Sequence, residues 1–161
     1  MRVRTVAVIT LSVSIAFSLT ACGAGRNAPT TLVTQVTDGV DGTINTLGND
    51  IRVRSFLLVT QPDGSAVVVG SMFNETTGVD DVLAIAVGEK VATFSKTSYP
   101  LLLNQPLHFS GDSANAKAVI AGLNATAGNR VQVKIFFSHA GEMDLDALVV
   151  ERSGIYAGVT A

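Results

Sequence analysis

The side chains with the clearest capacity for metal chemistry lie near the carboxyl end of the sequence. His139 and Met143 stand four residues apart with Glu142 between them. An imidazole and a thioether are soft donors of the kind that binds copper(I). His108 and Met72 could join them only if the fold brought those residues close. Two histidines without a fixed ligand spacing make a poor metal signature, so we expect a solvated turn histidine, a packed methionine and no cofactor.

Carboxylates are the second group of candidate functional residues. Asp144 and Asp146 share one face of a predicted strand. Further carboxylates lie in predicted loops, at Glu75, Asp80, Asp81 and Asp112. Paired carboxylates can perform acid–base catalysis or hold Ca²⁺. The sequence contains no Asp-x-Asp-x-Asp-Gly calcium loop, so we expect these groups to be solvated surface charges.

The sequence carries no motif for nucleophilic catalysis. Neither Gly-x-Ser-x-Gly nor Ser-x-x-Lys occurs, and no glycine-rich phosphate loop precedes a helix. Ser95 beside Lys96, and the Ser110-Gly111 pair, have ordinary loop composition. We therefore predict that the protein is not an enzyme.

The amino-terminal residues predict export. Arg2 and Arg4 form a cationic start, residues 6–19 form an uncharged apolar run, and Ala21 is small enough for the pocket of a processing enzyme. This run of about 14 residues is shorter than the roughly 20 that a membrane-spanning helix needs. We therefore expect residues 1–21 to be a cleaved signal peptide, with cleavage between Ala21 and Cys22.

Cys22 gives the leader its specific character. It is the only cysteine of the chain and directly follows Leu-Thr-Ala, which resembles the bacterial lipobox. That resemblance implies that the thiol becomes diacylglycerylated and that Cys22 becomes the first residue of the mature lipoprotein. Two acyl chains give stable attachment at about 0.8 kcal/mol per buried CH₂ group. We expect a protein that is anchored to the outer face of the cell membrane through this lipid, without spanning the membrane.

Composition restricts the partners and the domain count. Loss of Arg2 and Arg4 lowers the basic residues from 11 to 9 against 13 acidic ones, so the mature chain has a net charge of about −4. A negative charge without clustered lysine and arginine argues against nucleic acid as a partner. The mature length of about 140 residues is that of one ordinary domain, whose stability must come from its core because no disulfide can form.

Hydrophobic patterning predicts an all-β domain. The range 22–42 is polar and aperiodic and is expected to be the lipidated cysteine and a flexible tether. Period-two patterns then recur with turn signals between them, which predicts an antiparallel, Ig-like or cupredoxin-like β-sandwich of about 7–9 short strands over 43–155. Residues 156–161 are expected to form a short tail.

The strand assignments differ in clarity along the domain. Residues 51–59 and 66–73 should form a hairpin around Gln61-Pro62-Asp63-Gly64, with Ile51, Val53, Leu57 and Val59 on one face. Further strands are expected at 82–87, 91–94, 130–138 and 144–150, with short pieces near 99–103 and 106–109, and 116–123 fits a strand or a helix. Phe56, Leu58, Met72 and Phe136 fall on the opposite strand faces and could form an exposed patch for a partner or a lipid-like ligand, or could pack under the segment 99–109.

Two family resemblances follow from these motifs. The ending Thr-Ala-Cys-Gly-Ala-Gly, the strand 49–58 and the run from Ile120 to Gly141 resemble small actinobacterial lipoproteins of the LpqE type. The carboxyl-terminal half, with Gly122-Leu123, Gly128-x-x-Val131 and Ala140-Gly141, resembles the PCuAC periplasmic copper chaperones. The second resemblance implies a cupredoxin-like sandwich.

The PCuAC resemblance also implies a copper site that can be checked by position. Counting back from Gly122-Leu123 assigns the four ligand positions of that family to Ala84, Ser95, Lys117 and Val119. None of these is a soft donor, and Lys117 places a cation where the family has a histidine. The sequence thus favours a non-catalytic envelope binding module with an unidentified partner, and the alternative is a copper carrier with a rebuilt site.

Overall fold

The computed structural model describes residues 35–36, 39–46 and 48–161. The predicted signal peptide (1–21), its cleavage point, Cys22 and the first part of the predicted tether lie outside these residues. Within the described part, no helix has the length and hydropathy of a membrane span.

The described residues are almost entirely β-structure. The strands are β1 (Gln35–Val36), β2 (Gly39–Thr46), β3 (Asn49–Thr60), β4 (Ala66–Asn74), β5 (Asp80–Val87), β6 (Lys90–Val91), β7 (Thr93–Phe94), β8 (Pro100–Leu101), β9 (Leu107–His108), β10 (Ala118–Ile120), β11 (Arg130–Phe137) and β12 (Glu142–Val150). One 3₁₀ turn, Gly154–Tyr156, follows them. The all-β prediction is confirmed, and the strands outnumber the expected 7–9 because five of them are two residues long.

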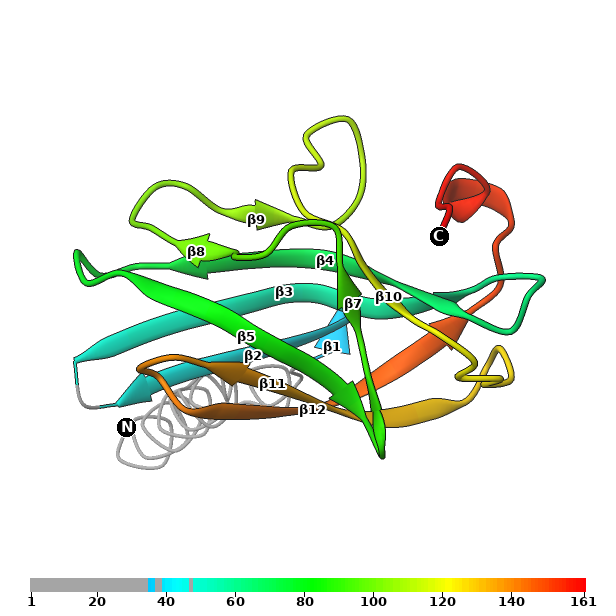
Figure 1. Ribbon diagram of the computed structural model, residues 1–161, viewed down its shortest axis with the longest axis horizontal. Coiled ribbons are helices and arrows are strands. Elements are labelled where there is room, and N and C mark those ends of the chain that lie inside the picture. Colours follow the sequence, from blue (N-terminus) through cyan, green and yellow to red (C-terminus); the bar gives the residue numbers. More distant parts are fainter. Residues whose placement is uncertain (1–34, 37–38, 47) are drawn as a thin grey trace, which may run out of the picture. The chain divides into compact units, whose positions relative to one another are not determined.

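Two layers of strands enclose one core (Figure 1). The hydrogen-bonded order is β6-β5-β11-β12-β3-β4-β10-β7, with β2 beside β3. Ile85 of β5 and Ile135 of β11 lie in the same buried cluster as Phe56 of β3 and Met72 of β4, and all four are fully buried. The sheet therefore curls over, so that β5, β11 and β12 face β3, β4 and β10.

One pairing departs from the antiparallel pattern. The strand β12 runs parallel to β3, with Leu148 opposite Leu57 and Val150 opposite Val59. Parallel neighbours need a long connection, and here nearly the whole domain lies between the two strands. This pairing joins the two layers, and local sequence patterns carry no signal for it.

The predicted first hairpin is confirmed. The strands β3 and β4 pair antiparallel, and Thr60 lies opposite Ala66. Gly64 adopts φ 79° in the turn, a conformation that glycine accepts without steric cost. The Asp63 carboxylate accepts hydrogen bonds from the backbone N–H and the hydroxyl of Ser65, at 2.9 and 2.7 Å, which hold the pKa of Asp63 below its ordinary value.

A bulge at Ser55 changes which side chains of β3 face the core. Ser55 has φ 51°, and the β3–β4 register shifts there. The extra residue turns Leu57 and Val59 away from the face of Ile51 and Val53 and into a second small cluster. The predicted common face of these four residues is therefore wrong beyond the bulge.

Of the two alternatives for Phe56, Leu58, Met72 and Phe136, the exposed patch is excluded for three of the four residues. Phe56, Leu58 and Met72 are fully buried in the main core, and Phe136 is half-buried. The bulge moves Phe56 and Leu58 inward, because it reverses the in–out alternation of β3. The large apolar side chains that are exposed in the described part are Val79, Leu83, Val91, Leu103 and Ile155.

The folded domain extends beyond the predicted range of 43–155 at both ends. The strand β2 begins at Gly39, inside the predicted tether, and Val40 is buried in the core. At the other end, Tyr156 and Val159 of the predicted tail pack against the second cluster, which contains Leu57, Val59 and Val69. The neighbours of Val40 are glycine and aspartate, which give no period-two alternation of apolar and polar residues. The sequence therefore does not predict the strand β2.

Candidate functional site

The soft donors near the carboxyl end do not converge. Met143 lies in the core, 6% exposed, and pairs across the ladder with Ile135. The His139 side chain lies on the surface and is 70% exposed. Met72 is buried in the other layer, whereas the His108 ring is half-buried with Nδ1 2.7 Å from the Ser71 hydroxyl. Among the residues described, no three His, Cys, Asp or Glu side chains are close enough to hold a metal ion.

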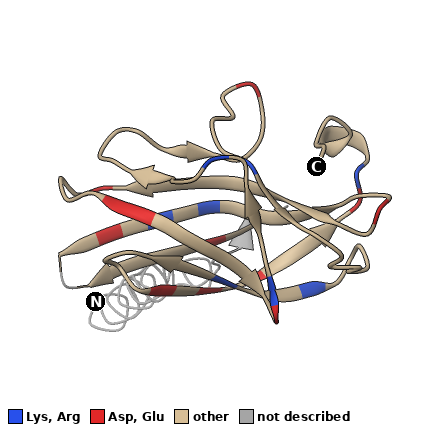
Figure 2. Ribbon diagram, in the orientation of Figure 1, with Lys and Arg blue, Asp and Glu red and all other residues tan. Residues whose placement is uncertain are grey.

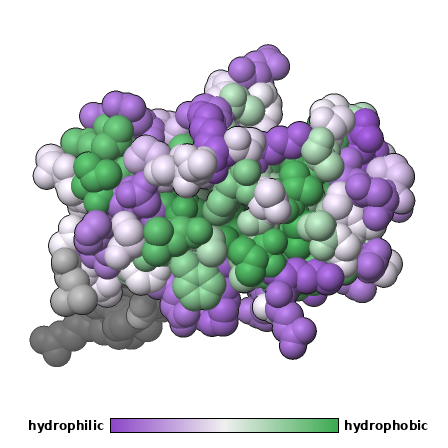
Figure 3. Space-filling view, in the orientation of Figure 1, coloured by the Kyte–Doolittle hydropathy of each residue, from purple (hydrophilic) through white to green (hydrophobic). Residues whose placement is uncertain are grey.

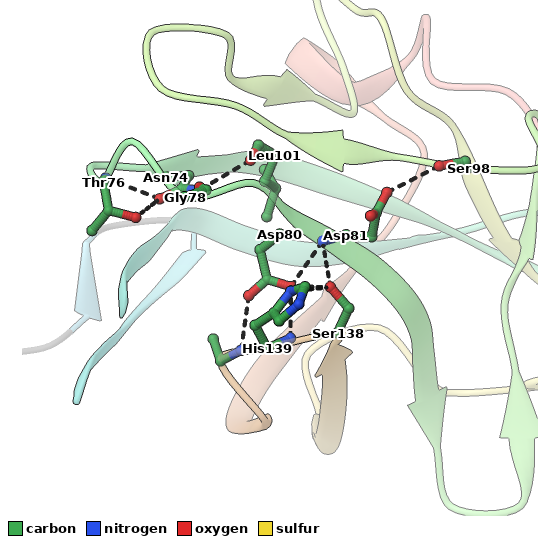
Figure 4. Close-up of polar contacts among 10 residues, drawn as sticks. Asn74, Thr76, Gly78, Asp80, Asp81, Ser98, Leu101, Ser138 and His139 are labelled. Carbon is green, nitrogen blue, oxygen red and sulfur yellow. Dashed lines mark hydrogen bonds and ion pairs between the residues drawn. The ribbon is translucent and has the colours of Figure 1, made fainter. Parts of the chain in front are cut away.

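Asp80 organises the turn that carries His139. Its carboxylate is 2% exposed and accepts hydrogen bonds from the Ser138 hydroxyl at 2.5 Å, the His139 N–H at 3.0 Å and the Ala140 N–H at 2.8 Å (Figure 4). The Asp81 N–H also donates to it, at 2.8 Å. Both carboxylate oxygens therefore accept hydrogen bonds, three on Oδ1 and one on Oδ2, from residues 138–140 and from the start of β5.

These contacts keep Asp80 ionised. Burial alone would raise the pKa of Asp80, but the hydrogen bonds from Ser138, His139, Ala140 and Asp81 favour the charged form and hold the pKa below its ordinary value. Nearby, the buried Asn74 amide donates to the Gly78 and Leu101 carbonyls and fixes the preceding loop in the same way (Figure 4). The buried polar side chains of Asp80 and Asn74 are therefore hydrogen-bonded within the protein itself.

The Asp80, Ser138 and His139 side chains do not form a catalytic triad. A triad places the histidine between the carboxylate and the hydroxyl, so that the ring can take the hydroxyl proton. Here the Ser138 hydroxyl donates directly to Asp80, while the Nδ1 atom of His139 lies 2.9 Å from that hydroxyl and 3.7 Å from the Asp80 carboxylate, so the ring does not stand between the two groups. Two cavities of the described part, one beside the 109–117 loop and a smaller one beside Asn74, are not lined by these residues.

The prediction of a solvated surface charge is wrong for Asp80, which is buried and hydrogen-bonded, and Asp81 is half-buried with its carboxylate 3.0 Å from the Ser98 hydroxyl. The other predicted carboxylates are exposed. Asp144 and Asp146 share the outer face of β12 as expected, and each is more than half exposed. Lys134 lies 2.8 Å from Asp144, whose hydrogen bond raises the pKa of that lysine. Figure 2 shows the opposite charges side by side on these two strands. Such exposed pairs contribute little stability and offer no site.

A cavity of about 720 Å³ opens on the surface of the described part. It opens between three segments, which are Ser95–Lys96 after β7, the 109–117 loop between β9 and β10, and the C-terminal segment, residues 154–161. Its lining consists of Val67, Ser95, Lys96, Phe109, Ser110, Gly111, Asp112, Ala114, Asn115, Ala116, Lys117, Ile155, Gly158, Val159 and Thr160. The volume lies within the usual range of small-molecule sites.

Side chains and backbone turns hold the walls of this cavity in place. The Asn115 side chain accepts from the His108 N–H and donates to the Pro106 carbonyl, both at 2.9 Å, which ties the 109–117 loop to β9. Gly111 adopts φ 83° where that loop turns back, and its carbonyl accepts from Ala114. The Gln61 amide donates to the Val159 carbonyl at 3.3 Å and holds the C-terminal segment.

Two of the positions assigned to copper ligands meet at this cavity. The Ser95 N–H donates to the Lys117 carbonyl at 3.1 Å, and both residues line the cavity. The Tyr99 hydroxyl joins them, 2.7 Å from the Ser95 hydroxyl and 3.2 Å from both the Lys117 N–H and its carbonyl. Of the other two positions, Val119 lies next to Val67 in the sheet.

The charges of the cavity are mainly positive. The Lys96 ammonium donates to the Asn115 carbonyl at 2.8 Å and lies 5.9 Å from the centre of the Tyr99 ring. The Lys117 ammonium makes no hydrogen bond or ion pair with any described residue. Figure 2 shows basic positions near the base of the 109–117 loop and an acidic position near its tip, and Asp112 is the acidic residue of the cavity lining. The sequence offered no signal for this site beyond the assignment of Ser95 and Lys117, because its walls come from distant segments.

Comparison with known proteins supports the fold. No protein-family model matches the sequence, and no curated protein matches it either. Among solved structures, the chain is similar to the apo PCuAC domain from PmoF1, with a TM-score of 0.57, 17% identity and coverage of 69% of this chain and 98% of that chain. The copper-bound PCuAC domain from PmoF2 gives a TM-score of 0.58 at 12% identity, covering 69% of this chain and 97% of that one. The predicted resemblance to PCuAC domains is confirmed at the level of the fold.

Proposed function

We propose that this protein is a lipid-anchored, extracytoplasmic binding protein that uses a PCuAC-like sandwich without the copper ligands of that family. It holds its ligand at the cavity formed by the 109–117 loop and the C-terminal segment, and it catalyses no reaction. The observation that carries this proposal is the pair Ser95 and Lys117, which line the cavity at two positions where a copper chaperone of this family has soft donors.

The donor set at these positions does not fit copper. Copper(I) prefers thioether, thiolate or imidazole ligands. Ala84, Ser95, Lys117 and Val119 supply none of them, and an ammonium group repels a metal cation. The other soft side chains are separated, since Met143 is buried in the core and His139 lies exposed on the turn. A cavity without donors for the metal supports a different ligand.

The copper carrier is the second candidate, favoured by the likeness in fold to a copper-bound PCuAC domain. A copper(I) competition titration of the mature chain, residues 23–161, separates the two candidates. The matched variants are His139→Ala and Met143→Leu, the second of which removes the sulfur while keeping the core volume. We expect no tight copper binding in any of the three proteins. One-to-one binding that is lost in either variant would establish the copper carrier and refute a copper-free site.

The anchor has its own test. Cells that produce the full chain are labelled with an alkyne-tagged fatty acid, and their proteins are partitioned in Triton X-114. The wild-type chain should carry the label and enter the detergent phase, whereas Cys22→Ser should do neither because it lacks the thiol that accepts the lipid. An unlabelled wild-type chain in the aqueous phase would contradict the predicted anchoring at Cys22.

A further inference from the structure

The cavity beside the C-terminal segment combines an apolar wall with a cationic base. Val67 and Phe109 form buried apolar parts of its lining. Ile155 is 81% exposed, the highest value among the large apolar side chains described. Exposed apolar surface is common on proteins, but here it adjoins a hollow that also carries two lysines. Figure 3 shows apolar surface across the middle of one face of the molecule, between polar margins.

The position of Lys117 directs its charge to the cavity. Val119 lies directly opposite Val67, which lines the cavity floor. Successive residues of a strand point to opposite faces, so Lys117 shares the face of Val119 while Ala118 points into the core. Lys117 is partly buried as a residue, and its ammonium makes no hydrogen bond or ion pair within the described part of the chain. An ammonium group held beside apolar walls gains from an anionic partner more than a fully solvated one does.

The second lysine reinforces this preference. Lys96 has one hydrogen bond, to the Asn115 carbonyl, and an ammonium can donate three. The lining contains one acidic residue, Asp112, on the exposed part of the loop, so cations exceed anions around the cavity. The predicted mature chain has a net negative charge, whereas the side chains that line the cavity have a net positive charge.

From these observations we infer that the cavity binds a small amphiphilic anion, with the Lys117 ammonium as the counter-ion of its carboxylate or phosphate group. The apolar body of the ligand lies against Val159, Ile155 and Phe109. This inference rests on the proposed binding function and names its ligand class. The volume of about 720 Å³ suits a molecule of small-lipid size.

The test is a fluorescence titration of the mature chain with 8-anilinonaphthalene-1-sulfonate, an anionic probe with an apolar body. The chain contains no tryptophan, so the signal of the dye is free of tryptophan emission. We expect saturable one-to-one binding that decanoate or decyl phosphate displaces, and decanol displaces at least about tenfold more weakly because it lacks the charge. The comparison of decanoate with decyl phosphate distinguishes the two anionic headgroups.

Matched variants locate the binding. Lys117→Met should weaken probe binding about tenfold or more, whereas Lys90→Met, an exposed lysine outside the cavity lining, should leave it unchanged. Gly158→Phe adds a ring in open space at the cavity wall, where a Cβ meets no atom within 4 Å, and should abolish binding without affecting the fold. Near-ultraviolet circular dichroism checks that each variant is folded.

The results that would overturn the inference are equally defined. Absence of saturable binding, displacement by decanol as strong as by decanoate, or equal affinities of the Lys117→Met and Lys90→Met proteins would each refute it. Such a failure leaves the lipid anchor and the copper titration unaffected, so it is distinguishable from failure of the proposed function.

Discussion

The polar groups around Asp80 and those around the cavity beside the 109–117 loop differ in whether they have partners. Around Asp80, the carboxylate is buried and accepts from the Ser138 hydroxyl and from the N–H groups of His139 and Ala140. Around the cavity, the Lys117 ammonium has no partner among the described residues, and Ile155 is largely exposed. The first arrangement is complete by itself and therefore stabilises the fold. The second is incomplete and therefore suits a ligand.

The comparison also separates conspicuous residue types from functional ones. His139 and Met143 are the residues that sequence reasoning singles out. The structure gives them no ligand role, because the His139 ring lies against the Ser138 hydroxyl and Met143 is buried in the core. Ser95 and Lys117 are chemically ordinary, yet they line the cavity of about 720 Å³. A site is identified here by what its groups lack, not by how reactive they are.

The largest effect is expected from removal of the Asp80 carboxylate. Asp80→Ala leaves a hydroxyl and three backbone N–H groups without their acceptor, and should lower the free energy of unfolding by about 3–4 kcal/mol. Urea denaturation measures this change. The control is Asp112→Ala at the cavity, which should change stability by less than about 0.5 kcal/mol. Equal losses of stability in the two variants would refute the conclusion that Asp80 stabilises the fold and the cavity residues do not.

Acid should remove the same stabilisation gradually. The pKa of Asp80 is lower in the folded chain than its ordinary value, so its contribution is fully present above the ordinary aspartate pKa and is lost as pH falls through the folded pKa. The stability difference between wild type and Asp80→Asn should be constant at neutral pH and shrink below about pH 4. Urea denaturation between pH 7 and pH 2.5 measures it. A difference that stays constant throughout would mean that the charge of Asp80 is irrelevant.

A smaller effect is expected at Met143. Met143→Ala removes a buried side chain from the core and should cost about 2–3 kcal/mol, whereas Met143→Leu conserves the volume and should cost less than about 1.5 kcal/mol. Thermal or urea unfolding compares the two variants. Equal loss in both would indicate that the sulfur itself matters, which would bring Met143 back as a candidate ligand.

Sequence patterns predict the local features of this fold and miss the long-range ones. The turn at Asp63-Gly64 follows from its residue types, and so does the strand β11, in which Val133 and Ile135 alternate with polar residues. The bulge at Ser55 does not follow, because it depends on residues elsewhere in the chain. A Cβ at Gly39 would lie 2.4 Å from the Ser55 backbone, and one at Gly70 would meet the same bulge at about 3 Å, so two distant glycines make room for it.

The candidate site was still harder to predict. Its walls come from Ser95, Lys117 and Val159, which are separated by some 20 to 40 residues and belong to segments with loop-like composition. Only the counted spacing from Gly122-Leu123 pointed to Ser95 and Lys117, and it did so as positions that had lost their ligands. The sequence predicts only a tail for the C-terminal wall of the cavity. Tyr156 and Val159 pack against Leu57, and Leu57 reaches that face only because the bulge turns it away from the main core.

The smallest effect is expected at Lys117, and it decides how the cavity should be understood. In the absence of ligand, Lys117→Met keeps the aliphatic stem and removes an ammonium that has no partner in the described part, so the free energy of unfolding should change by less than about 0.5 kcal/mol. Urea denaturation of wild type and variant at low ionic strength measures this. A loss above about 1 kcal/mol would show that Lys117 contributes to the fold as Asp80 does. Unchanged stability, together with weakened binding of the anionic probe, would separate the two regions into one that maintains the structure and one that holds a ligand.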